Sequence, residues 1–68
     1  MQNVEQLTRL WTQAQPVVAG FLTATLPQYE LAQDLLQEVA VIVLRKFEEF
    51  DETKGTFTGW SLGIAKRE

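Results

Sequence analysis

One amphipathic stripe in the middle of the chain limits its fold more than any other feature of the sequence. Between Gln28 and Phe50 apolar residues recur every three or four positions, and no glycine or proline interrupts them. At 3.6 residues per turn they fall on one side of a helix. The stripe therefore predicts a helix from about Gln28 to Phe50 that buries one side in a core. Its members are Ala32, Leu36, Val39, Ala40, Val43, Phe47 and Phe50.

A second helix is predicted before it. Apolar residues from Val4 to Leu22 also step by three and four, as expected of an amphipathic helix. Pro16 falls inside this segment and removes one backbone hydrogen bond. We therefore expect a first helix that is kinked or split in two.

A third helix is predicted after a polar turn. The segment Asp51 to Thr56 is rich in turn residues, and Gly55 is its best candidate for a positive φ. Thr56 or Thr58 can cap the periodic stretch that follows, which reaches Glu68 without a glycine or proline stop. We thus expect an all-α bundle of three main helices, a single domain over residues 1–68 that is a fragment truncated inside its last helix.

Composition excludes several classes of site. The 68 residues include no cysteine and no histidine, so disulfides, Cys/His zinc sites and His-based nucleophile systems are excluded. The longest apolar run, Val39 to Leu44, is too short to span a bilayer, and no secretion signal is evident, so we expect a cytoplasmic protein without membrane insertion. The net charge is −3, but residues 53–68 alone carry a net charge of +2. A nucleic-acid contact would lie at that end.

The outer side of the middle helix is the first candidate site. Asp34, Gln37 and Glu38 are neighbours on one helical face, with Arg45 a few turns along and the apolar Val41 among them. Taken alone, the polar trio is better explained as an ordinary solvated surface. An apolar centre with a polar rim is, however, typical of a protein interface.

The turn after that helix is the second candidate site. Phe50, Phe57 and Trp60 flank it, and either close the core or offer a stacking surface to an unstacked base. Lys66 and Arg67 lie further along the chain. Their positive charges either stabilise the negative end of the last helix or contact phosphate groups.

Several motifs together resemble region 2 of bacterial RNA polymerase sigma factors, most closely the extracytoplasmic-function group. These motifs are "DLLQEV", "FDETKGTFTGW" and "GIAK". They align without gaps with the residues that are usual in the family. The match covers about Val4 to Glu68. Departures from the usual residues fall mainly where the family contacts DNA; they include Ile42, Glu52, Thr58, Gly63 and Arg67.

The resemblance implies two binding surfaces and no cofactor. In that family the Asp-x-x-Gln-Glu face docks on the clamp helices of the polymerase β′ subunit. The loop receives a flipped base of the promoter −10 element, and the next helix follows the non-template strand. The implied polymerase-binding residues are Asp34, Gln37, Glu38, Val41 and Arg45. The implied DNA-binding residues are Asp51, Lys54, Gly55, Thr56, Phe57, Lys66 and Arg67. An anti-sigma factor is a further implied partner.

Two other functions compete with this interpretation. A helical adaptor that occupies the polymerase without contacting DNA is favoured by the acidic balance of the chain. A carboxylate-based hydrolase or metal protein using Asp34 and Glu38 lacks a second ligand cluster. We therefore expect a transcription initiation factor that is not an enzyme.

Overall fold

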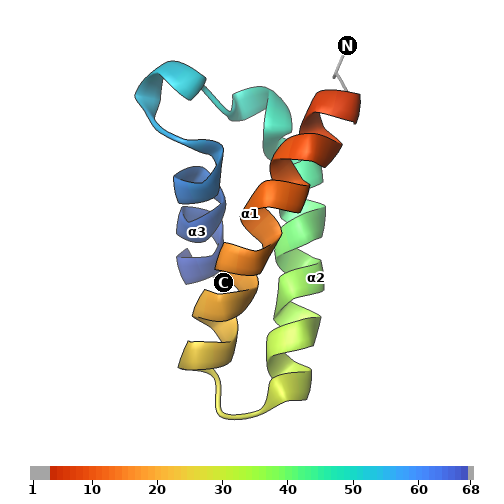
Figure 1. Cartoon of the computed structure of the whole chain (residues 1–68), viewed down its shortest axis with the longest axis vertical. Coiled ribbons are helices and arrows are strands. Elements are labelled where there is room, and N and C mark those ends of the chain that lie inside the picture. Colours follow the sequence, from red (N-terminus) through yellow and green to blue (C-terminus); the bar gives the residue numbers. More distant parts are fainter. Residues whose placement is uncertain (1–3, 68) are drawn as a thin grey trace.

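The computed structural model describes residues 4–67, which form helices and loops and contain no strand (Figure 1). The expected all-α bundle of three main helices is confirmed. None of the helices in this part of the chain combines the length and apolarity needed to cross a bilayer. The elements are α1 (Val4–Thr25), α2 (Tyr29–Lys46), the 3-10 helices η1 (Phe47–Glu49) and η2 (Glu52–Lys54), and α3 (Phe57–Arg67).

Helix α1 runs without a break through Pro16, so of the two expected alternatives, a kink or a split, the split is wrong. Pro16 is exposed, and the carbonyl of Thr12, which loses its helical partner to the proline, belongs to an exposed residue as well. Water can therefore satisfy that carbonyl. The helix continues to Thr25, where the threonine hydroxyl donates to the carbonyl of Phe21 at 2.7 Å.

Helix α2 ends at Lys46, four residues before the end predicted from the stripe. The chain tightens into η1, and the amide of Phe50 donates to the carbonyl of Phe47 at 3.0 Å. Such 3-10 turns are common at helix ends because they satisfy carbonyls that the α-helix leaves open. This tightening directs the chain from α2 into the loop that leads to α3.

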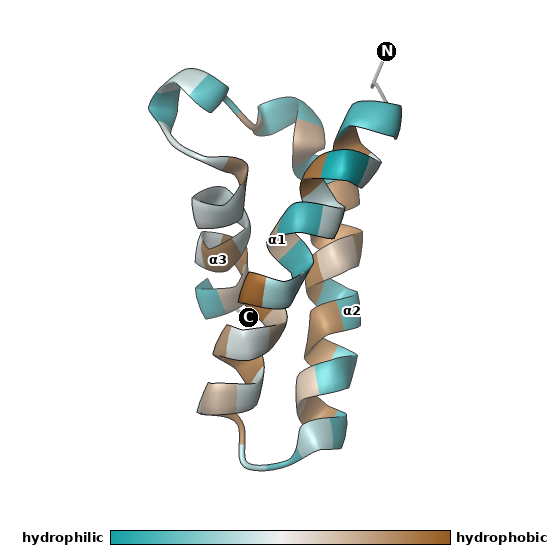
Figure 2. Cartoon of the chain, viewed as in Figure 1, coloured by the Kyte–Doolittle hydropathy of each residue, from teal (hydrophilic) through white to brown (hydrophobic). Residues whose placement is uncertain are grey.

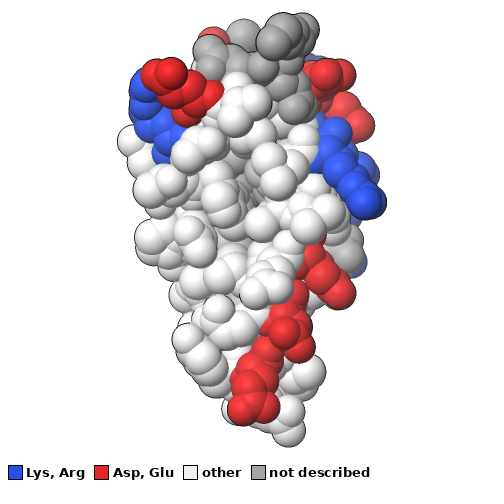
Figure 3. All heavy atoms as spheres, turned by 90° about the vertical axis from the view of Figure 1, so that its right-hand side faces the viewer, with Lys and Arg blue, Asp and Glu red and all other residues white. Residues whose placement is uncertain are grey.

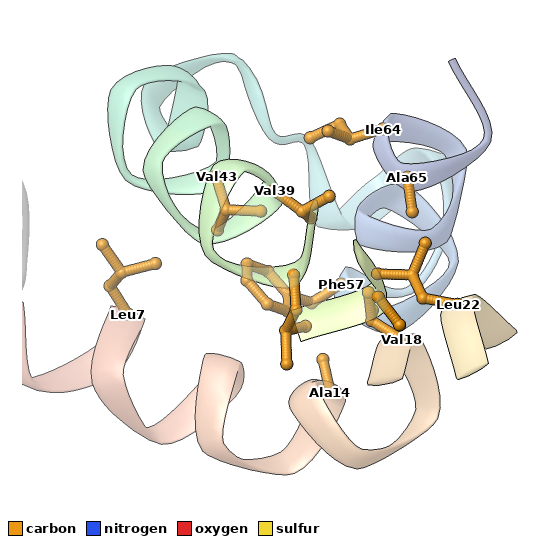
Figure 4. Packing of buried hydrophobic residues seen from close by; sticks show 11 residues of the cluster. Leu7, Ala14, Val18, Leu22, Val39, Val43, Phe57, Ile64 and Ala65 are labelled. Atoms are coloured by element: carbon orange, nitrogen blue, oxygen red, sulfur yellow. The ribbon is translucent and has the colours of Figure 1, made fainter. Parts of the chain in front are cut away.

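The core lies where the three helices meet (Figure 4). Ala40, Phe47 and Phe50 were also expected there, but they are half-buried, and of the three Phe47 and Phe50 pack against the core. Burying each valine or leucine contributes about 1.5–3 kcal/mol. Figure 2 shows that the segment between α2 and α3 is largely hydrophilic, whereas the inner sides of the helices are hydrophobic. The buried apolar residues are Leu7, Ala14, Val18, Leu22, Ala32, Leu36, Val39, Val43, Phe57, Ile64 and Ala65.

Helix α3 is capped by Thr56. Its Oγ1 accepts a hydrogen bond from the amide of Gly59 at 3.0 Å, and its carbonyl accepts one from the amide of Trp60. Thr58 lies inside the helix, so of the two predicted caps the structure selects Thr56. This cap fixes where the loop ends and the helix begins.

Replacing Thr56 with alanine should destabilise the fold by about 1 kcal/mol, because an amide at the start of α3 loses its acceptor. Thermal unfolding followed by circular dichroism should show a melting temperature lower by about 4–8 °C. Thr56→Ser keeps the hydroxyl and should melt close to the unchanged chain. Equal melting temperatures for the two variants would contradict the capping role.

Candidate functional site

The first candidate surface is the outer side of α2 (Figure 3). All five residues implied to bind polymerase are exposed, and Val41 retains 44% of its accessible surface. The opposite side of the helix carries the buried Leu36, Val39 and Val43. The structure therefore leaves this face open. The five residues are Asp34, Gln37, Glu38, Val41 and Arg45.

Two exposed leucines extend this surface and were missed by the sequence analysis. Leu31 is 49% exposed and Leu44 is 54% exposed. Leu31, Asp34, Glu38, Val41 and Arg45 follow one another at steps of three and four, so they form a seam along the helix. Their spacing could have revealed Leu31, which stands one step before Asp34.

Charge is unevenly distributed along this face. Glu30, Asp34 and Glu38 stand four residues apart, and Figure 3 shows acidic side chains in a line along the lower part of this side of the molecule. Cationic side chains lie higher, where Arg45 and Lys46 end α2. A partner helix with cations opposite the acidic row would match this pattern.

The second candidate surface is a pocket of about 420 Å³ at the loop between α2 and α3. Of the residues implied to bind DNA, Asp51, Lys54, Gly55 and Thr56 line it. Phe57 is only 6% exposed and belongs to the core. The other lining residues are Phe50 and Trp60, which the sequence analysis considered as a stacking surface, and Gly59, which it missed.

Four aromatic rings form the base of this loop. Phe57 meets Phe50 edge-on, with ring centroids 5.4 Å apart, and lies 5.6 Å from Trp60. Phe50 and Trp60 are 5.3 Å apart, and Phe47 contacts both Phe50 and Phe57. The two expected roles of the aromatic residues thus fall to different rings. Phe57 closes the core, whereas Phe50 and Trp60 are half-buried and line the pocket.

A tight turn shapes the polar side of the pocket. Asp51 Oδ1 accepts hydrogen bonds from the amide of Thr53 at 2.9 Å and from its hydroxyl at 2.6 Å. These two bonds lower the pKa of Asp51, the hydroxyl more than the amide. Gly55 then takes a φ of 157° and a ψ of −176°, a region used almost only by glycine, and this confirms the predicted positive φ.

The two cations at the end of α3 lie in line with the pocket. Gly59 and Lys66 are seven residues apart, as are Trp60 and Arg67, so each pair shares a helical face about 10 Å apart along the axis. Both cations are exposed. Lys66 Nζ also lies 5.9 Å from the centre of the Phe21 ring. A strand leaving the pocket along α3 would meet these charges.

No group of three or more His, Cys, Asp or Glu side chains that could hold a metal ion occurs within residues 4–67. Asp34 and Glu38, the pair considered for a metal or hydrolase site, are exposed neighbours on one helix.

The comparisons with known proteins point to one family. A family model described as sigma-70 region 2 matches residues 10–68. The matched range includes α2, the loop pocket and α3. A search of curated proteins gives no match, and neither does a search of solved structures.

The turn at Asp51 can be tested by titration. Its pKa should lie below the usual 3.8 because the fold favours the ionised carboxylate. The stabilisation this gives is therefore present above the usual pKa and is lost as pH falls through the lowered value. Thr53→Val removes the hydroxyl donor and should raise the pKa of Asp51, measured from the pH dependence of its carboxyl ¹³C shift. Thr53→Ser should leave it lowered, and an identical pKa in all three proteins would contradict the turn.

Proposed function

The chain belongs to the sigma-70 region 2 family, and we propose that it docks on the β′ clamp helices of RNA polymerase through α2 and holds an unpaired base of the promoter −10 element in the loop pocket. Membership of the family gives the chain a role in transcription initiation, in which region 2 acts with core polymerase and promoter DNA. Region 2 domains are regulatory rather than enzymatic. The extracytoplasmic-function group is the subgroup we propose, on the sequence motifs given above.

The observation that carries the proposal is the pocket between α2 and α3. It lies where the family resemblance puts the base-binding loop, and it has aromatic walls from Phe50 and Trp60. Stacking a base on an aromatic ring contributes about 1–3 kcal/mol. Flipping a base costs a few kcal/mol, so stacking in this pocket offsets much of that cost. We therefore assign the stacking role to Phe50 and Trp60, since the ring of Phe57 is buried.

The docking face supports the other half of the proposal. Val41 forms an apolar centre on an otherwise polar surface, and interfaces are commonly built in this way. Asp34, Gln37 and Glu38 surround it and would fix the orientation of a basic partner helix. Leu31 and Leu44 would extend the apolar contact at its two ends.

A polymerase-binding adaptor without a DNA role is the second candidate function. The charge of −3 favours it, as do Thr58 and Gly63, which stand where the family often carries basic residues. Three cations, Lys54, Lys66 and Arg67, serve the proposed DNA side. A single strand that they contact would show a salt slope of only about −2. Binding of a −10-type single strand to the polymerase complex, with and without loop changes, distinguishes the two functions.

Reversing one charge on the docking face should strongly weaken binding to polymerase. Glu38→Lys places a cation in the acidic row, so affinity for a β′ clamp-helix fragment should fall at least tenfold, while the exposed position leaves melting nearly unchanged. Titration calorimetry measures the affinity. The control is Glu5→Lys, which makes the same charge change at an exposed residue of α1. Undiminished binding by Glu38→Lys would show that this face does not dock.

Exchanging the loop should change the base preference. When Asp51 to Thr58 is replaced by the same segment of another sigma factor, the −10 base that supports promoter opening should change, because the lining of the pocket changes. Permanganate reactivity of unpaired thymines, on promoters varied one base at a time, reports opening. Affinity for polymerase should stay the same. An unaltered base preference would show that the loop is only a structural corner.

A further inference from the structure

An apolar groove of about 130 Å³ lies between α1 and the outer side of α2. Leu44 lines it and is 54% exposed, and Val41, three residues earlier on α2, is 44% exposed. A cavity of about 150 Å³ accepts a benzene molecule, so the groove has room for one apolar side chain. Figure 3 shows a broad uncharged surface beside the acidic side chains on this side of the molecule. The groove is lined by Leu7, Thr8, Trp11, Ala40, Val43 and Leu44.

One anion and one cation stand on either side of Val41. Glu38 and Arg45 are seven residues apart, so they share one face of α2 and lie about 10 Å apart along its axis. Both are exposed, and neither makes an ion pair within residues 4–67. A helix face with this order of charges is complementary to a copy of itself that runs in the opposite direction.

We propose that two copies of this chain associate through α2, with the two helices antiparallel and related by a two-fold axis beside Val41. Glu38 of each copy is then level with Arg45 of the other, so two ion pairs form. At a rise of 1.5 Å per residue, Val41 of each copy lies about 3 Å along the axis from Leu44 of the other. The contact thus has an apolar centre between charged pairs, as interfaces commonly do.

The charges select the antiparallel arrangement. A parallel pair would place Glu38 against Glu38 and Arg45 against Arg45, and like charges facing each other are repulsive. Two-fold pairs are the commonest homo-oligomers, because one self-complementary surface is enough to close them. The surface is small, since it consists of one helix face and the adjoining groove, so the dimer is weak.

The dimer also regulates the proposed docking on polymerase, and this consequence rests on the proposed function. Glu38, Val41 and Arg45 belong to the face that we assign to polymerase, so a second copy covers that face. Polymerase and the second copy therefore compete for α2. The association of the two copies does not itself depend on the polymerase assignment.

Sedimentation equilibrium of the chain at increasing concentration tests the association. Between about 10 μM and about 1 mM, the range expected of a small interface, the average mass should rise from that of one chain towards twice that value. A mass that stays at one chain over this whole range would overturn the inference.

Two charge reversals test the arrangement. Glu38→Arg and Arg45→Glu each replace two attractions by two repulsions, so each variant should associate about tenfold more weakly than the unchanged chain. An equimolar mixture of the two should regain the association, because the cations of one variant face the carboxylates of the other. A mixture that associates no better than either variant alone would overturn the antiparallel pairing.

The matched control is Glu30→Arg. It makes the same charge change at an exposed residue of the same helix. In the antiparallel pair Glu30 is level with position 53 of the second copy, which lies beyond the end of its α2. This variant should therefore associate like the unchanged chain, and an equally weakened association would overturn the pairing of Glu38 with Arg45.

A β′ clamp-helix fragment distinguishes failure of this inference from failure of the proposed function. Added to the dimer, the fragment should separate it into complexes of one chain and one fragment, which sedimentation detects by their mass. A complex of two chains and two fragments would overturn the competition. If the fragment does not bind even the dilute, monomeric chain, the proposed docking on polymerase fails, and the association of two copies is still decided by the mass of the chain alone.

Discussion

The burial of Phe57 between the end of α2 and the start of α3 is the interaction on which the corner between these helices and its pocket depend. Its ring meets Phe47, Phe50 and Trp60 at centroid distances of 5.4–6.0 Å. Aromatic pairs of this kind contribute about 0.5–1.5 kcal/mol each beyond their buried area. Together they hold a loop whose own backbone bonds are few. With Phe57 in the core, Phe50 and Trp60 stand at its edge, where their outer surfaces line the pocket.

Periodicity was enough to predict the helices but not the fine placement of their ends. The stripe from Ala32 to Val43 has one phase, and the core follows it. The end of α2 depends on contacts of Phe47 and Phe50 with α3, which no local pattern encodes, and the predicted helix was therefore four residues too long. Continuity through Pro16 likewise depends on its exposure, which only the packed structure reveals.

The candidate site was predictable to the same degree. Exposure of the α2 face followed from the phase of the stripe, because residues opposite a buried side must be exposed. Phe57 and Trp60 stand three residues apart on one amphipathic helix, so spacing alone does not distinguish the core ring from the pocket ring. That choice is made by the neighbours Phe47 and Phe50. The sequence also did not predict the hydrogen bonds from Thr53 to Asp51 Oδ1, since the two residues come together only when the turn is formed.

Helix α2 connects the two proposed activities mechanically. Its inner side forms the core through Leu36, Val39 and Val43, its outer side carries Val41, and its last turn leads through η1 into the aromatic corner. A partner that binds the outer side of α2 stabilises the folded form by mass action, and the helix end from which the pocket is built is stabilised with it.

The chain itself has a fully buried serine, Ser61, whose hydroxyl lacks a partner within the described residues, at a cost of about 1–3 kcal/mol. In a domain this small, such a cost leaves little stability in reserve. The proposed docking on polymerase and the proposed holding of a base would then be coupled, because the first would stabilise the structure that the second requires.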